Sequence, residues 1–183
     1  MAEDVSIIEE QPNVHQTMMD KAYELWSKPE ENKRMSYEGF LEMVSEELGD
    51  NYVDAVITGN MNYQVENGGW FQWHDNGYSV TIEELISFFE KPEFNNYIEI
   101  KKLREILSSV EEQLDWKERG DREIQQVDYD FKDIFENALN EEFDKAVDHL
   151  DSKYYEISKK VMDILENYFS QKNLDEINGE SNK

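Results

Sequence analysis

A row of carboxylates between Asp128 and Asp151 is the set of side chains in this sequence whose types and spacing could do chemistry. Acidic residues recur there at steps of three or four, which places them on one side of an α-helix. We call this row the acidic stripe; its carboxylates are Asp130, Asp133, Glu141, Asp144, Asp148 and Asp151, and the uncharged amide Asn137 lies at one position among them. Carboxylates held in a row attract cationic groups. The predicted chemistry is therefore electrostatic binding of a basic partner.

The length of the acidic stripe can be compared with that of a nucleic acid. At about 1.5 Å of rise per residue, Asp130 and Asp151 would lie roughly 32 Å apart, which is about the axial length of nine base pairs of B-form DNA. Neighbouring like charges at this spacing cost a few tenths of a kcal/mol per pair in an isolated helix. The row must therefore be stabilised by packing of the opposite face or by a partner.

Other kinds of chemistry find little support in the sequence. His15, His74 and His149 are scattered without the spacing of a metal site, and we expect each to be a surface histidine or one satisfied by hydrogen bonds. There is no cysteine and no glycine-rich loop that would hold a phosphate. We therefore predict no catalytic residue, no metal and no cofactor. An enzyme with its site near Trp70 and His74 stays open as an alternative.

The helix that carries the stripe needs an apolar face. The apolar positions between 128 and 151 fall on one broad arc, which we expect to face a core. They are Phe131, Ile134, Phe135, Ala138, Leu139, Phe143, Ala146, Val147 and Leu150. Glu142 projects towards the same arc with no partner that the sequence indicates.

The rest of the chain predicts further helices and no strand. Helical spacing runs over residues 14–26, 36–48 and 51–65, then after a capping box at Thr81 and Glu84, and from Pro92 to about Arg119, before Gly120. The pattern resumes after 151 with a break near Asp151 and Ser152. We predict an all-α, single compact multi-helix domain with an acidic surface over residues 13–171, a flexible arm at 1–12 and a flexible tail at 172–183.

The balance of charge indicates which partners to expect. The chain has 43 acidic and 18 basic residues, a net charge of -25, which repels nucleic acids and anionic membranes. From residue 111 to 151 there are 15 acidic and 5 basic residues, against 9 and 4 in the 60 residues before. Glu111, Glu112, Asp115 and Glu118 form a second acidic group there. No long apolar run or secretory signal is present, so we expect a cytoplasmic protein.

The most distinctive motif of the sequence lies between residues 67 and 76. Asn67, Gly68 and Gly69 can supply the positive φ angles that end one helix and start another, with Trp70, Phe71 and Trp73 filling the space under the turn. Together with Gln72 and Asn76, this motif resembles the N-G-G-aromatic-x-Q-aromatic signature of a bacterial and phage domain family that includes an acidic DNA mimic. The resemblance implies a mostly helical domain and, for at least one relative, inhibition of a DNA-binding protein by charge mimicry.

The stripe and the resemblance together favour a DNA-mimicking inhibitor that occupies the basic nucleic-acid-binding site of a target. We expect an anti-defence role, as an anti-CRISPR or anti-restriction protein acting in the host cytoplasm if a phage encodes it. The partner would be a CRISPR nuclease, a restriction enzyme or a transcription regulator, without direct contact to nucleic acid. An immunity protein that neutralises a basic toxin nuclease stays open, and so does a homodimer.

Overall fold

A computed structural model describes residues 13–27, 35–76 and 81–180 of the chain, without the side chains of residues 130 and 174–180. In these ranges the backbone forms seven α-helices and a 3-10 turn, and no strand. The elements are α1 (Val14–Ser27), α2 (Tyr37–Leu48), α3 (Asp50–Asp75), α4 (Ile82–Phe89), η2 (Pro92–Phe94), α5 (Ile98–Ile124), α6 (Tyr129–Tyr155) and α7 (Ser158–Glu180). The predicted all-α fold class is confirmed.

The helix ends follow the capping signals of the sequence. The Ser36 hydroxyl accepts a hydrogen bond from Gly39 N at the start of α2, and α2 ends before Gly49. At the start of α4 the predicted capping box is present, because Thr81 Oγ1 accepts from Glu84 N while the Glu84 carboxylate accepts from Thr81 N.

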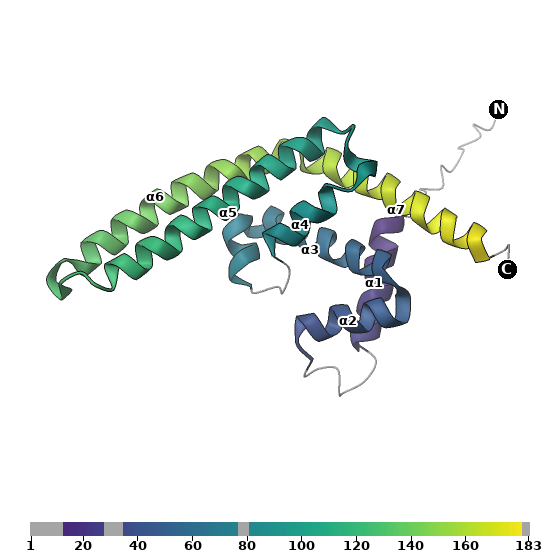
Figure 1. The fold of residues 1–183 in the computed structure, drawn as a ribbon, viewed down its shortest axis with the longest axis horizontal. Helices are drawn as coiled ribbons and strands as arrows, with labels where there is room; N and C mark the ends of the chain where they lie inside the picture. The colour runs from purple at the N-terminus through teal and green to yellow at the C-terminus, as the bar shows by residue number, and fades with distance from the viewer. Residues whose placement is uncertain (1–12, 28–34, 77–80, 181–183) are drawn as a thin grey trace, which may run out of the picture.

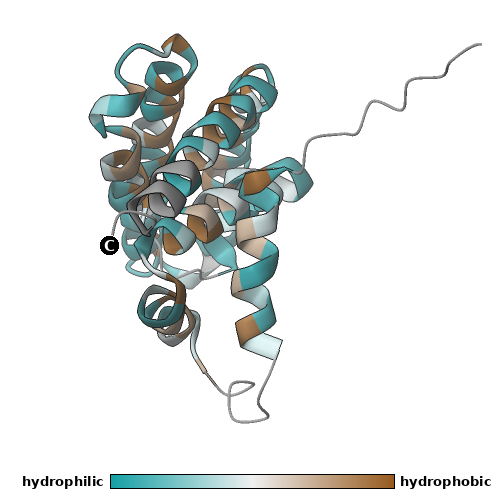
Figure 2. Cartoon of the chain, turned by 90° about the vertical axis from the view of Figure 1, so that its right-hand side faces the viewer, coloured by the Kyte–Doolittle hydropathy of each residue, from teal (hydrophilic) through white to brown (hydrophobic). Residues whose placement is uncertain are grey.

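The main core lies where α3, α4, α5, α6 and α7 meet, and large side chains from all five fill it. Trp70, Phe89, Leu103, Tyr154 and Phe169 are fully buried there. A smaller cluster joins α1, α2 and α3 through Ala22, Phe40, Val44 and Val56. Figure 2 shows hydrophobic and hydrophilic positions alternating along the helices, as expected where one face of each helix packs inward.

The two longest helices determine the shape of the molecule. α5 and α6 run side by side as a long hairpin, and its far end projects beyond the other helices (Figure 1). The connection between the two helices is the short segment 125–128. We call α5 and α6 the acidic hairpin, because they carry both acidic groups singled out above. The core is packed against the base of the hairpin and leaves its far end outside.

Several predicted boundaries differ from the structure. α5 does not end before Gly120 but continues to Ile124. A Cβ at position 120 would lie 2.7 Å from Leu139 Cδ1, so this glycine lets α6 approach α5 closely. The break after the stripe falls at 156 and 157, not at Asp151 and Ser152. α7 stays helical to Glu180 and so runs past residue 172, where a tail was expected to begin. The predicted arm at 1–12 lies outside the described residues.

Candidate functional site

The acidic stripe lies on one uninterrupted helix, because α6 runs from Tyr129 to Tyr155. The side chains of Asp133, Asn137, Asp144 and Asp148 are exposed, and no ion pair involving them is found in the described part of the chain. The side chain of Asp130 is outside the described atoms. The second group lies on α5, where Glu112, Asp115 and Glu118 are exposed and Glu111 is half-buried. The hairpin therefore presents carboxylates from both of its helices.

Two carboxylates of these groups already have a cationic partner. The Glu141 carboxylate accepts from Lys145 Nζ at 2.7 Å, and this hydrogen bond holds the pKa of Glu141 below its ordinary value. Glu118 lies 3.5 Å from Arg122. Both pairs are exposed and join residues four apart on a helix, an arrangement that contributes little to stability. A cationic group of a partner can therefore displace Lys145 or Arg122 from its carboxylate at a small cost in free energy.

The last residue of the stripe has a different environment. Asp151 is half-buried, and its Oδ1 accepts a hydrogen bond of 2.8 Å from the backbone N–H of Trp70. Burial raises the pKa of Asp151, the Trp70 N–H opposes that shift, and the nearby charge of Asp148 adds to it. Asp151 thus joins α6 to the Gly-Gly turn of α3, and the stripe that is open to a partner ends at Asp148.

The Gly-Gly turn bends α3 in its second half. Gly69 has a φ of 78° and a ψ of -179°, a conformation almost confined to glycine, whereas Gly68 has a φ of -164° and a ψ of 15°, outside the left-handed region. A Cβ at Gly69 would lie 2.1 Å from Asp151 Oδ2. The predicted positive φ is therefore confirmed at Gly69 only. Trp70 and Trp73 are buried under the turn as predicted, but Phe71 is 47% exposed and packs edge-on against Phe143.

The polar residues of the motif hold the two halves of α3 together. Gln72 Nε2 and Asn76 Nδ2 both donate to Oε1 of the buried Gln64, at 2.9 and 2.8 Å. Asn67 Nδ2 donates to the carbonyl of Tyr63. Two further bonds tie α6 to α3, because the hydroxyl of Tyr154 donates to Asn62 Oδ1 and that of Tyr155 to Val65 O. The motif region orients the base of the acidic hairpin.

The apolar residues predicted to form one buried arc on α6 are buried in one half of the helix and exposed in the other. Phe143, Val147 and Leu150 are buried, which confirms the prediction for the half of the helix near the core. Phe131, Ile134 and Phe135 are 56%, 65% and 53% exposed, so the expectation that they face a core is wrong. The reason is that the far end of the hairpin extends beyond the helices that form the core (Figure 1). Glu142 is exposed, so it needs no buried partner.

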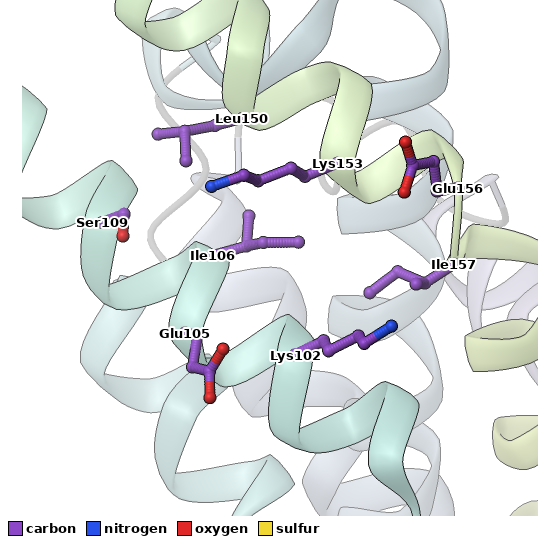
Figure 3. Close-up of a pocket in the computed structure, with 8 residues that line it drawn as sticks. All are labelled: Lys102, Glu105, Ile106, Ser109, Leu150, Lys153, Glu156 and Ile157. Atoms are coloured by element: carbon purple, nitrogen blue, oxygen red, sulfur yellow. The ribbon is translucent and has the colours of Figure 1, made fainter.

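A groove of about 350 Å³ lies between α5 and α6 near the base of the hairpin (Figure 3). Two lysines and two glutamates balance each other around an apolar floor, and Figure 3 shows Ile106 between the two lysine side chains. The lining residues are Lys102, Glu105, Ile106, Ser109, Leu150, Lys153, Glu156 and Ile157. The groove thus differs from the rest of the hairpin in having no excess of negative charge.

The three histidines are far from forming a common site. His15 is buried in the core, where its Nε2 lies 2.9 Å from Ala55 O and 3.2 Å from Thr58 Oγ1, and its ring stacks on Phe169. Burial lowers the pKa of His15, although the Ala55 carbonyl and the charge of Glu166 oppose that shift. His74 and His149 are exposed. Over the described residues no three His, Asp or Glu side chains are grouped as a metal site would require.

Comparison with protein-family models identifies the family of this chain. The family model described as DMP19-like protein matches residues 46–173, which is more than half of the chain and includes both the Gly-Gly turn and the acidic hairpin. The chain therefore belongs to the DMP19-like family. This membership is consistent with a DNA-mimic protein, and the family is not one of enzymes. No curated protein and no solved structure matches the chain.

No helix in the described ranges is both long enough and apolar enough to cross a membrane.

Proposed function

We propose that this protein is a DNA-mimicking inhibitor whose acidic hairpin occupies the basic nucleic-acid-binding site of a target protein. The observation that carries the proposal is the hairpin itself. Residues 111–151, which make up most of its projecting part, contain 15 acidic and 5 basic residues. Membership of the DMP19-like family supports the same function.

The dimensions of the exposed stripe suit a phosphate track. From Asp133 to Asp148 the helix rises by roughly 22 Å at about 1.5 Å per residue, which is about the length of six base pairs of B-form DNA. Both residues are on α6 and both are exposed. A cleft that binds a short stretch of duplex can therefore receive the stripe as a substitute.

The rigidity of the hairpin explains how carboxylates could compete with real phosphates. Each side chain projects from a helix that packs along its neighbour, so little backbone entropy is lost when a target binds. A net charge of -25 also steers a basic partner towards the protein from a distance. Binding of this type is fast at low salt and weakens as salt rises.

We place the target among basic nucleic-acid-binding proteins and expect an anti-defence role, against an RNA-guided CRISPR nuclease or a restriction enzyme, with a transcription regulator as the other class. An RNA-guided nuclease holds its heteroduplex in a positively charged channel and reads its short DNA motif with arginines, so an acidic helical rod could block either place.

The test is a displacement assay preceded by affinity capture. The immobilised protein is exposed to a bacterial lysate at low salt, and the proteins that high salt releases are identified and purified. Each is then loaded with fluorescent duplex DNA and titrated with the inhibitor. Displacement of the DNA by an equimolar amount of the protein supports the proposal. A captured partner that binds the protein and its DNA at the same time would contradict it.

A further inference from the structure

The exposed apolar side chains at the far end of the hairpin form a surface patch on α6 that the acidic stripe does not include. Phe131, Ile134, Phe135 and Ala138 follow the spacing i, i+3, i+4 and i+7, so they share one face of α6, and all four are exposed. We call this face the tip patch. The three large side chains are each more than half exposed, whereas a solvent-exposed helix normally carries polar residues at such positions.

The tip patch is turned away from the side of α6 that packs. At 100° per residue, Phe143, Val147 and Leu150 lie on a face about 130° from the centre of the tip patch. Those three are buried, and Leu139, which contacts α5 next to Gly120, lies on their side of the helix. The tip patch is therefore not the edge of the core, and no described element of the chain covers it.

The charges beside the tip patch indicate what it binds. Glu141 and Glu142 follow the tip patch along the helix, about 70° and 30° around from its centre, whereas Asp133 lies about 150° around, on the opposite side. All three are exposed. An apolar strip bordered by carboxylates is complementary to an apolar strip bordered by Lys or Arg. A second copy of this chain would instead bring two acidic rows together, which like-charge repulsion disfavours.

We infer that the tip patch docks a basic amphipathic helix of the target protein. The inference rests on the function proposed above and deepens it, since DNA has no counterpart to an apolar strip beside its phosphates. The acidic stripe would supply long-range attraction to any basic cleft, while the tip patch would select targets that offer apolar side chains next to their cations. Binding to such a target would keep part of its strength at high salt, because apolar contact is not screened.

Two synthetic helical peptides of equal length and equal positive charge test this inference. One carries a row of Leu flanked by Lys, and in the other Ala replaces every Leu. Binding is measured by fluorescence anisotropy at low and high salt, with the full chain. The unmodified protein is expected to bind the Leu peptide about tenfold more tightly than the Ala peptide, since burial of one or two large apolar side chains gives at least that factor.

The variants separate the patch from the stripe. Phe131→Gln with Phe135→Gln should abolish the preference for the Leu peptide and leave binding of the Ala peptide unchanged. The control is Ile98→Gln, which alters a residue that is 57% exposed at the opposite end of α5. That variant should keep the full preference. Glutamine is a good helix former, so both changes leave the helices intact.

Three outcomes would overturn the inference. The unmodified protein could bind both peptides with equal affinity, or the variant Phe131→Gln with Phe135→Gln could keep the preference for the Leu peptide. In the third, the unmodified protein and the Ile98→Gln control sediment as dimers while the Phe131→Gln, Phe135→Gln variant is a monomer. The last result would assign the patch to a second copy. Failure of the proposed function has another signature. In that case Asp133→Asn with Asp144→Asn and Asp148→Asn would leave binding of both basic peptides unchanged at low salt.

Discussion

Asp151 Oδ1 accepts a 2.8 Å hydrogen bond from the backbone N–H of Trp70, across 81 positions of the sequence. The bond links the helix that carries the acidic stripe to the turn that bends α3. It satisfies a backbone donor that the non-helical conformation of Gly68 and Gly69 leaves without a helical partner. The two features that stand out in the sequence, the motif and the stripe, are thus one structural unit.

Replacing Asp151 should destabilise the protein by an amount that depends on whether the new side chain can accept the hydrogen bond from Trp70 N–H. Asp151→Ala leaves the Trp70 N–H unpaired beside the core and should lower the free energy of unfolding by about 1–3 kcal/mol. Asp151→Asn keeps an acceptor and removes a charge that burial disfavours, so it should cost less than half as much. Denaturant unfolding of both variants gives the comparison. Equal losses would show that the charge, and not the hydrogen bond, is what matters.

Gly69 and Gly49 form a matched pair for testing the turn. Both have positive φ angles and extended ψ values, 78° and -179° at Gly69 and 95° and 164° at Gly49. A Cβ at Gly49 would meet nothing within 4 Å, whereas one at Gly69 would meet the Asp151 carboxylate. Gly49→Ala should therefore show the backbone strain alone, about 1–3 kcal/mol. Gly69→Ala should lose that amount and most of the Asp151 contribution as well, as measured by thermal unfolding.

The buried histidine predicts a pH dependence of stability. Because burial lowers the pKa of His15 in the fold, the unfolded chain binds more protons between that lowered pKa and the ordinary value of 6.5. Stability should therefore fall as pH drops through 6.5 and level off below the lowered pKa. His15→Gln removes this titration and should flatten the fall in Tm between pH 7 and pH 5. Parallel curves for the two proteins would rule out His15 as the source.

The start of α1 has two caps: Asn13 Oδ1 accepts a hydrogen bond from Gln16 N at 2.8 Å, and α7 supplies the other. The Glu166 carboxylate accepts hydrogen bonds from Val14 N and His15 N, at 2.8 and 2.9 Å. Glu166→Ala should destabilise the protein by more than Ser36→Ala, which removes one capping bond from α2 and should cost about 0.5–2 kcal/mol. Amide hydrogen exchange should show faster exchange confined to α1 in the first variant. Unchanged protection of α1 would mean that its packing and the Asn13 cap suffice without Glu166.

The sequence predicts the helices well because their signals are local. The capping residues Ser36 and Thr81 and the spacing of Phe143, Val147 and Leu150 are read directly from neighbouring positions. The exposure of Phe131 and Ile134 was only partly predictable: helical spacing places them on a different face from Phe143, Val147 and Leu150, but it does not show whether another element covers that face. That depends on α5 and α6 extending beyond the core.

For the candidate site, the sequence predicts which carboxylates are exposed but not which residues from distant segments contact them. The exposed positions of Asp133, Asp144 and Asp148 follow from the period of the helix. The contact between Asp151 and Trp70 does not, since it joins two distant segments. One signal for it was present, because two consecutive glycines indicate a place where another part of the chain can approach the backbone closely.

The central claim is that the stripe on α6 replaces DNA phosphates in a basic cleft. The most direct test is the binding constant for a captured target across a range of salt concentrations, for three proteins: the unmodified chain, Asp133→Asn with Asp144→Asn and Asp148→Asn, and a control with Glu42→Gln, Glu46→Gln and Glu47→Gln. The control removes the same charge from exposed positions on α2. We predict that the α6 variant binds at least tenfold more weakly at low salt, with a shallower dependence on salt, while the control keeps most of the affinity. Equal losses in the two variants would contradict the claim, because net charge alone would then account for binding.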